Sequence, residues 1–331
     1  MSTSHLPALV QRFFTQRLLE QQGVSPHTVA SYRDTFRLLL AFATKETGRM
    51  PAKIMIEELD TYLIEGFLHY LEQERGNSIR TRNTRLAAVH AFFQFVAVQE
   101  PALGLQCQRI LAIPSKRCEH GPVEFLTERE ATALIAAPDH RTWIGNRDRA
   151  LLLLAFQTGL RNSELRAIRR QDVVFGTGAH VRCFGKGRKM RCTPLRPDVV
   201  SILKGWMNRH PGQPDDPLFP SSRGGWMSAD ALQKLVSKHV VTASAVCPTL
   251  KEKAVTPHTL RHAAAMNLLM HGVDLTVIAL WLGHESTETT QIYLHADMGL
   301  KERALAHTNP SGVVPDRYKP SDPLLSFLES L

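Results

Sequence analysis

Apolar residues recur at helical spacing through the first hundred residues of the chain. Ser25-Pro26 is typical of a helix start, because a capping serine is followed by a proline at the first helical position. The apolar positions that follow are Val29, Tyr32, Phe36, Leu39 and Leu40. Similar patterns predict helices over 62–74 and 78–98. The N-terminal part is therefore expected to be helical.

The third of these helices begins with a cluster of arginines. Arg80, Arg82 and Arg85 precede an apolar stripe that holds the helix in a core. Basic residues on such a packed element are suited to phosphate contacts, so these three are candidates for contacts with a phosphate backbone. The alternative is an amphipathic helix with a solvated charged end, which this segment alone favours.

The helical pattern breaks in a segment that contains Pro114 and then His120-Gly121-Pro122, and it resumes at Thr127, where Glu130 completes a capping box. An apolar helix is predicted over 149–158. Short alternating runs around a glycine-rich turn predict a β-hairpin over 180–195. Further helices are predicted over 198–208, 229–242 and 258–271.

These patterns predict a fold that is mainly α with a small β-sheet, divided into two domains. The predicted parts are a helical N-terminal domain (1–110), a linker (111–122), an α+β domain (123–309) and a C-terminal tail with a short amphipathic helix (310–331).

Composition narrows the class of protein. The 331 residues carry a formal net charge of +9, which favours a polyanionic partner such as nucleic acid. Five cysteines lack the spacing of a disulfide framework or zinc site. The start lacks the pattern of a secretory signal, and the longest apolar run, 150–156, is far too short for a membrane span. We expect a cytoplasmic protein without a membrane partner.

The positive charge is concentrated between positions 158 and 196. Two acidic residues, Glu164 and Asp172, stand there against ten basic ones, which are Arg161, Arg166, Arg169, Arg170, Arg182, Lys186, Arg188, Lys189, Arg191 and Arg196. This density predicts a groove for a phosphate backbone.

Two candidate site segments lie within this basic region. In Thr-Gly-Leu-Arg-Asn-Ser-Glu-Leu, Arg161 and Glu164 are three apart, so the carboxylate can orient the guanidinium; a surface ion pair is the alternative. In the predicted hairpin turn, Lys186 can reach a phosphate or the oxygen that leaves it, with Arg188 and Lys189 as further DNA contacts. Structural hairpin turns also often carry lysine.

Two more candidate segments follow. Pro257 favours a helix start that places His258 and Arg261 on one face, a good phosphate contact. His258 and His262 also have a spacing that occurs in metal sites, but the glutamate of the metalloprotease pattern is missing. Leu-Gly-His at 282–284 is followed by Tyr293, which alone would be interpreted as a core residue.

Taken together, these segments resemble the tyrosine recombinase (phage integrase) family over nearly the whole chain. Their order and approximate spacing match the family, and the helices around 25–33 and 85–93 resemble its core-binding domain. The resemblance implies a SAM-like, helical core-binding domain followed by a catalytic domain. The C-terminal tail leads us to expect a mobile-element integrase or transposase.

The resemblance also implies a role for each candidate residue. Tyr293 would attack a DNA phosphate to give a 3′-phosphotyrosine and a free 5′-hydroxyl. Arg161 and Arg261 would hold the non-bridging oxygens, and His284 would donate to the phosphate. Lys186 would protonate the leaving oxygen, and His258 would assist proton transfer at Tyr293. Glu164 would brace the site; no metal, ATP or other cofactor is implied.

The implied partners are double-stranded DNA and further recombinase subunits. Family members act as tetramers on two DNA sites, so we expect a homo-tetramer or a complex with related recombinases, with the tail around 324–328 contacting a neighbour. The alternatives are a topoisomerase IB-like enzyme or telomere resolvase, a metal-dependent nuclease, and a catalytically silent DNA-binding regulator or accessory subunit. A nuclease would need clustered carboxylates, which these segments lack.

Overall fold

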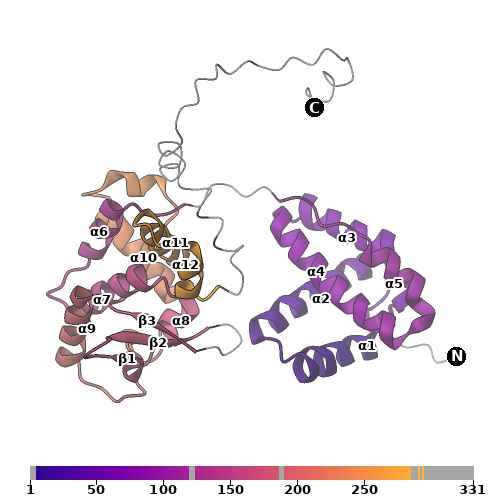
Figure 1. Cartoon of the computed structure of the whole chain (residues 1–331). Coiled ribbons are helices and arrows are strands. Elements are labelled where there is room, and N and C mark those ends of the chain that lie inside the picture. The colour runs from indigo at the N-terminus through magenta and orange to yellow at the C-terminus, as the bar shows by residue number, and fades with distance from the viewer. Residues whose placement is uncertain (1–4, 119–123, 186–189, 285–289, 291–292, 294–331) are drawn as a thin grey trace, which may run out of the picture. The chain divides into compact units, whose positions relative to one another are not determined.

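The computed structural model describes residues 5–118, 124–185, 190–284, 290 and 293. The chain divides into two compact units, residues 1–120 and 121–331. Figure 1 shows a helical N-terminal unit and a second unit in which helices surround a small sheet. This agrees with the predicted fold class.

The N-terminal unit is built from helices whose starts are capped as the sequence indicates. Ser25, Asp60 and Ser78 each accept a hydrogen bond from a backbone N–H in the first turn of the helix that follows. Its helices are α1 (Leu6–Arg12), the π-helix η1 (Phe13–Gln21), α2 (Pro26–Thr47), α3 (Thr61–Gln73), α4 (Ile79–Gln99) and α5 (Gly104–Leu111), with 3₁₀ turns at Pro51–Lys53, Ile56–Glu58 and Pro101–Leu103.

The core of this unit extends beyond its last helix. Cys107 and Ile110 on α5 are buried with the aromatic cluster of α2 and α4, and Ile113 is buried as well. Arg82 Nη1 donates to the carbonyl of Pro114 at 3.0 Å, and Asn83 and Lys116 form two further hydrogen bonds. The first residues of the predicted linker are therefore attached to the N-terminal unit.

The second unit contains a three-stranded antiparallel sheet in the order β1-β2-β3, with helices around it. Its elements are α6 (Glu128–Ala136), α7 (Trp143–Thr158), α8 (Asn162–Ala167), β1 (Val173–Val174), β2 (His180–Phe184), β3 (Met190–Pro194), α9 (Pro197–Arg209), α10 (Ala229–Ala243), α11 (Pro257–Met270) and α12 (Leu275–Leu282), with 3₁₀ turns at Arg170–Asp172 and Pro248–Glu252. The predicted hairpin and the capping box of Thr127 and Glu130 are confirmed.

Helix α7 begins at Trp143, six residues before the predicted start at Arg149. The apolar pattern missed its first turns because they contain buried charged residues. Asp148 is 1% exposed, and it accepts hydrogen bonds from Arg147 and from His239 of α10. Arg147 also donates to the carbonyl of Pro220. Charged residues that are paired inside the unit interrupt an apolar pattern without interrupting the helix.

Gly159 ends α7 and brings three segments together. It has a φ of +62°, a conformation that glycine adopts without strain. A β-carbon at this position would lie 2.5 Å from Leu282 of α12 and 3.2 Å from Ala264 of α11. The turn that leads into Arg161 is therefore packed directly against α11 and α12.

None of the helices within the described residues combines the length and the apolar character needed to span a lipid bilayer.

Candidate active site

Arg161 lies at the N-cap of α8, and Glu164 is the third residue of that helix. Glu164 accepts from the backbone N–H of Arg161 at 2.8 Å and from its Nη1 at 3.0 Å. The predicted ion pair is present. Arg161 is the N-cap residue of α8, however, so the pair does not lie on one face of a helix. The guanidinium is thereby fixed at the start of the helix.

Arg191 on β3 completes this arrangement, although the sequence pattern predicted no individual role for it. Its two terminal nitrogens donate to the two carboxylate oxygens of Glu164, each at 2.8 Å, in a bidentate pair. Burial raises the pKa of Glu164, but the bonds from Arg191 and Arg161 outweigh it and hold that pKa below its usual value. The alternating pattern of β3 could indicate which way Arg191 points, but it could not identify Glu164, which lies 27 residues away in the sequence.

Arg261 of α11 is held by backbone carbonyls. Its side chain donates to Gly159 O at 2.6 Å and to Leu282 O at 2.8 Å. Arg161 donates to the next carbonyl, that of Gly283, at 2.7 Å. The two arginines predicted to grip a phosphate are thus anchored to consecutive carbonyls at the end of α12.

The site carries more positive than negative charge. Arg261 is 3% exposed; its burial, and next the positive charge of Arg161, lower its pKa to about 10. Among the described residues at this end of α12, three arginines stand against the single carboxylate of Glu164. An excess of buried cations over anions favours binding of an anion.

His284 follows the left-handed C-cap of α12, Gly283. Its Nδ1 lies 2.7 Å from the hydroxyl oxygen of the buried Thr290. Burial, followed by the nearby arginines, lowers the pKa of His284 to about 4. A β-carbon on Gly283 would lie 2.7 Å from Arg191 Nη1, so this loop is packed against β3.

Tyr293 is buried, at 1% exposure, against α11 and α12. Its hydroxyl oxygen lies 2.9 Å from Nδ1 of His262. Burial raises the pKa of Tyr293 to about 12, although the charge of Arg261 acts in the opposite direction. Tyr293 therefore packs against α11, the helix that carries Arg261.

The histidine that contacts Tyr293 differs from the one that the sequence predicted. His258, predicted to assist Tyr293, is exposed near the start of α11, and its ring lies 4.3 Å from that of His262. The sequence drew attention to His262 only as half of a metal pair. No cluster of three or more metal-ligand side chains occurs in the described parts of the chain.

The predicted DNA contacts differ in their surroundings. Lys186, Arg188 and Lys189 lie outside the described residues, as does the tail. Arg80 is exposed, whereas Arg85 donates to Thr35. Arg82 is 6% exposed and pairs with Glu72 at 3.3 Å, so its guanidinium serves the packing of its own unit and does not fit the predicted phosphate contact.

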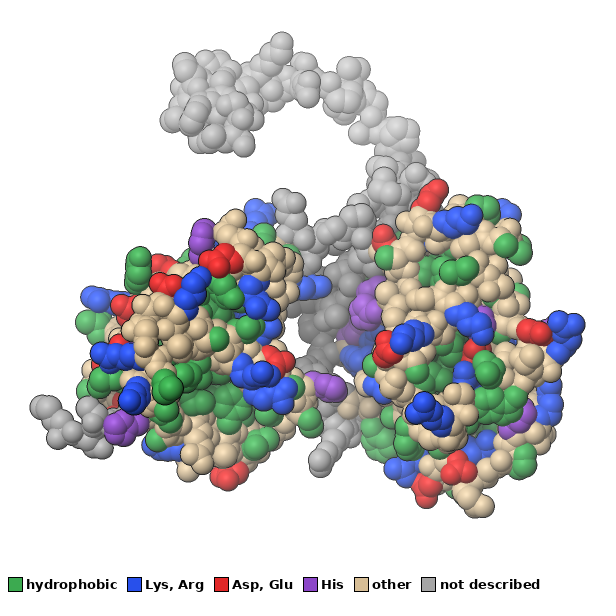
Figure 2. Space-filling model, turned by 180° about the vertical axis from the view of Figure 1, so that it is seen from behind, with side chains coloured by type: hydrophobic (Ala, Val, Ile, Leu, Met, Phe, Trp, Pro, Cys, Tyr) green, Lys and Arg blue, Asp and Glu red, His purple; other side chains and the backbone are tan. Residues whose placement is uncertain are grey.

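Much of the basic density between 158 and 196 also serves internal contacts. Seven of the ten basic residues are described, and each donates to a partner within the chain, as Arg166 does to Asn162, Arg169 to Asp215, Arg170 to Met207, Arg182 to Gln171 and Arg196 to Asp198. The face drawn in Figure 2 has Lys and Arg side chains on both units, interspersed with acidic and apolar ones. Density along the chain thus overstates the charge available to a ligand.

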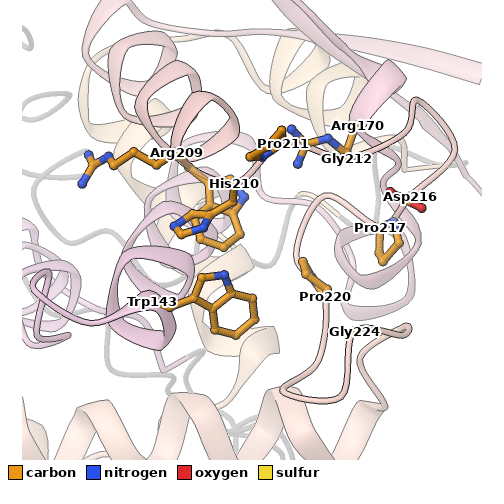
Figure 3. A pocket seen from close by; sticks show the side chains of 11 residues that line it. Trp143, Arg170, Arg209, His210, Pro211, Gly212, Asp216, Pro217, Pro220 and Gly224 are labelled. Atoms are coloured by element: carbon orange, nitrogen blue, oxygen red, sulfur yellow. The ribbon is translucent and has the colours of Figure 1, made fainter.

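A separate cavity of about 420 Å³ lies between α7, α9 and the loop after α9. Figure 3 shows Trp143 below His210, with Arg170 and Asp216 at the side. None of the predicted site residues lines it. The candidate active site is therefore the arginine cluster beside Tyr293 and not this cavity.

Comparisons with known proteins identify the family of this chain. The Phage integrase family matches residues 124–299, and the family's N-terminal SAM-like domain matches residues 11–100. The chain therefore belongs to the phage integrase family, the tyrosine recombinases that break and rejoin DNA at specific sites.

Individual relatives cover nearly the whole chain. A putative integrase/recombinase, y4rC of Sinorhizobium fredii, is 51% identical over 98% of both chains. The tyrosine recombinase XerC of Pelobacter propionicus is 31% identical over 92% of this chain and 96% of its own. Among solved structures, a lambda integrase tetramer bound to a Holliday junction has a TM-score of 0.61 at 17% identity, covering 86% of this chain and 79% of that one.

Proposed function

We propose that this chain cuts and rejoins duplex DNA at a specific site through a 3′-phosphotyrosine at Tyr293, without a metal ion or ATP. The observation that carries the proposal is the pair Arg161 and Arg261, anchored on the consecutive carbonyls of Gly283 and Leu282 beside Tyr293. Two fixed guanidinium groups suit the non-bridging oxygens of one phosphate and the charge that develops on them.

The remaining residues would divide the other tasks. The Tyr293 oxygen attacks phosphorus while the P–O5′ bond breaks, and the 5′-oxygen takes a proton from Lys186. His284 donates to the phosphate, and His258 assists proton transfer at Tyr293. Glu164 with Arg191 fixes Arg161. Attack by the 5′-hydroxyl of a partner strand then releases Tyr293, so the energy of the phosphodiester is conserved in the protein–DNA ester and no external energy source is consumed.

The proposed partners are double-stranded DNA and three further recombinase subunits, of this chain or of a related one. The lambda integrase tetramer on a Holliday junction supports this assembly through its similar fold. The reaction would take place in the cytoplasm and would serve the integration, excision or transposition of DNA. The name of the Sinorhizobium relative, integrase/recombinase, supports this range of outcomes.

A trapping experiment tests the proposal. Suicide DNA substrates drawn from the sequences that flank the gene are incubated with wild type, with Tyr293→Phe and with Tyr62→Phe, a control in which an exposed tyrosine is changed. We expect an SDS-resistant adduct with wild type and with Tyr62→Phe, unchanged by EDTA and absent with Tyr293→Phe. Tight DNA binding without any adduct would instead favour the catalytically silent DNA-binding regulator.

A further inference from the structure

The hydroxyl of Tyr293 is in contact with a base. Nδ1 of His262 lies 2.9 Å from the tyrosine oxygen, and the two rings meet edge to face with centroids 5.5 Å apart. Tyr293 is buried and His262 is partly buried. The contact is therefore partly shielded from solvent.

His258 has a different position on the same helix. It is the second residue of α11, one turn before His262, and it is exposed. The first turn of a helix presents free backbone N–H groups and the positive end of the helix dipole. These surroundings suit a phosphate contact, whereas the enclosed position of His262 suits a proton transfer.

We propose that His262, rather than His258, accepts the proton of Tyr293 when the tyrosine oxygen attacks the DNA phosphate. The inference rests on the proposed function and adds a catalytic residue to it. As the O–P bond forms and the P–O5′ bond breaks, the O–H electron pair stays on the tyrosine oxygen and the proton moves to Nδ1. In rejoining, the imidazolium returns this proton to the departing tyrosine oxygen.

The electrostatics of the site keep the ring of His262 unprotonated, so that it can accept a proton. Burial, followed by His258 and Arg261, lowers the pKa of His262 to about 4. His262 is therefore neutral near pH 7, and with its hydrogen on Nε2 it offers the Nδ1 lone pair to the hydroxyl. The pKa of Tyr293 is raised to about 12, so direct ionisation of the tyrosine would be rare without a base.

The charged and titratable neighbours of His262 set how strongly it accepts the proton. In the described part of the chain these are His258 and Arg261 on α11, with Tyr293 and His284 from the segment that follows. A phosphate held by Arg261 would offset the positive field of that arginine. Substrate binding would thus raise the affinity of His262 for a proton at the step that requires it.

The first measurement is the pH dependence of single-turnover adduct formation for wild type, His262→Gln and His262→Ala. At pH 7 we expect both variants to react roughly 10²-fold or more slowly. Without the base, tyrosine must ionise directly, so the ratio of variant to wild-type rate should rise by roughly tenfold per pH unit between pH 6 and 9. Using the ratio cancels titrations that both proteins share.

Two controls separate a proton acceptor from a structural residue. Imidazole added to His262→Ala should restore part of the rate, which it would not do if the ring only supported packing. A substrate with sulfur in place of the 5′-bridging oxygen needs no general acid, so it should rescue Lys186→Ala but leave His262→Ala slow. DNA affinity, measured alongside, should stay within about twofold of wild type, since His262 is not a phosphate contact in this scheme.

The outcomes are distinct. A flat pH ratio, absence of imidazole rescue, or cleavage by His262→Ala at the wild-type rate or above would overturn the assignment to His262. If His258→Gln instead shows the rising pH ratio, the proton acceptor is His258. Failure of the wild-type protein to form any adduct would count against the proposed function itself.

Discussion

The two units of this protein both bury arginines, but the balance of buried charge around these arginines differs. In the N-terminal unit, Arg82 pairs with Glu72, which also accepts from Lys116, and Nη1 of Arg82 donates to Asn83 and to the carbonyl of Pro114. In the catalytic unit, Glu164 binds two arginines, and the hydrogen bonds that fix Arg261 within the described chain go to backbone carbonyls.

The difference separates arginines that hold a unit together from the arginines that we propose bind a phosphate. Arg82 is matched by a carboxylate and by one linker carbonyl, and these contacts hold its own unit together. Arginines that outnumber their carboxylate retain a positive field, and carbonyl groups fix their direction without neutralising them. Burial alone therefore does not identify a ligand site, whereas the local balance of charge does.

Among the substitutions that test this comparison, Arg261→Lys should have the largest effect. A lysine keeps the charge but cannot bridge the carbonyls of Gly159 and Leu282 while presenting a planar pair of donors. Adduct formation should fall roughly 10²- to 10³-fold. Rapid-quench trapping measures this rate, with Arg166→Lys, another arginine of the unit, as the matched control; near-wild-type cleavage by Arg261→Lys would contradict the role of Arg261.

Arg191→Met should act on both stability and chemistry. Glu164 then pairs with Arg161 alone, which destabilises the catalytic unit by about 2–3 kcal/mol. The carboxylate also offsets more of the positive charge of Arg161. In the folded protein we expect cleavage about tenfold slower. A double-mutant cycle with Glu164→Gln, followed by denaturant unfolding, measures the coupling; additive effects of the two substitutions would disprove the link.

Arg82→Met tests the N-terminal half of the comparison. Because Lys116 stays on Glu72, we expect a loss of about 1–2 kcal/mol in the stability of this unit, with DNA affinity and its salt dependence unchanged. Hydrogen exchange of α3 and α4, together with binding titrations at several salt concentrations, provides both readings. If the slope of log affinity against log salt concentration is lower by about 1 in Arg82→Met than in wild type, Arg82 does contact a phosphate, as the sequence predicted.

The smallest effect is the response of the catalytic unit to mild acid. His262 and His284 have pKa values lowered to about 4 in the folded chain, while unfolded histidines titrate near 6.5. Between these values the unfolded chain binds more protons, so stability is lost as the pH falls below 6.5. From pH 7 to 6 we expect a loss of roughly 0.5 kcal/mol for each histidine.

Hydrogen exchange on the full chain at pH 7 and 6 detects this loss, with His262→Gln and His284→Gln as variants in which it should shrink. The N-terminal unit serves as an internal reference. Its His90 also has a pKa lowered by burial, so a small response is expected there as well.

Sequence patterns were sufficient where structure depends on neighbouring residues. Capping serines, helical periodicity and the alternation of the hairpin depend on contacts within a few positions, and they predicted α2, α3, α4 and the β2–β3 hairpin. They were insufficient at α7, whose first turns carry Arg147 and Asp148. The partners that allow these charges to be buried lie on α10 and near Pro220.

The sequence by itself determined the family and the mainly helical, two-part fold, and it supplied the residues that we propose carry the chemistry, because spaced motifs such as Thr-Gly-Leu-Arg and His-x-x-Arg-His persist as patterns along the chain. The tertiary structure decided what each side chain faces. It paired Arg191 with Glu164, placed His262 on Tyr293 and buried Arg82, because these contacts join residues between 10 and 31 positions apart. No local spacing encodes a distance across a folded core.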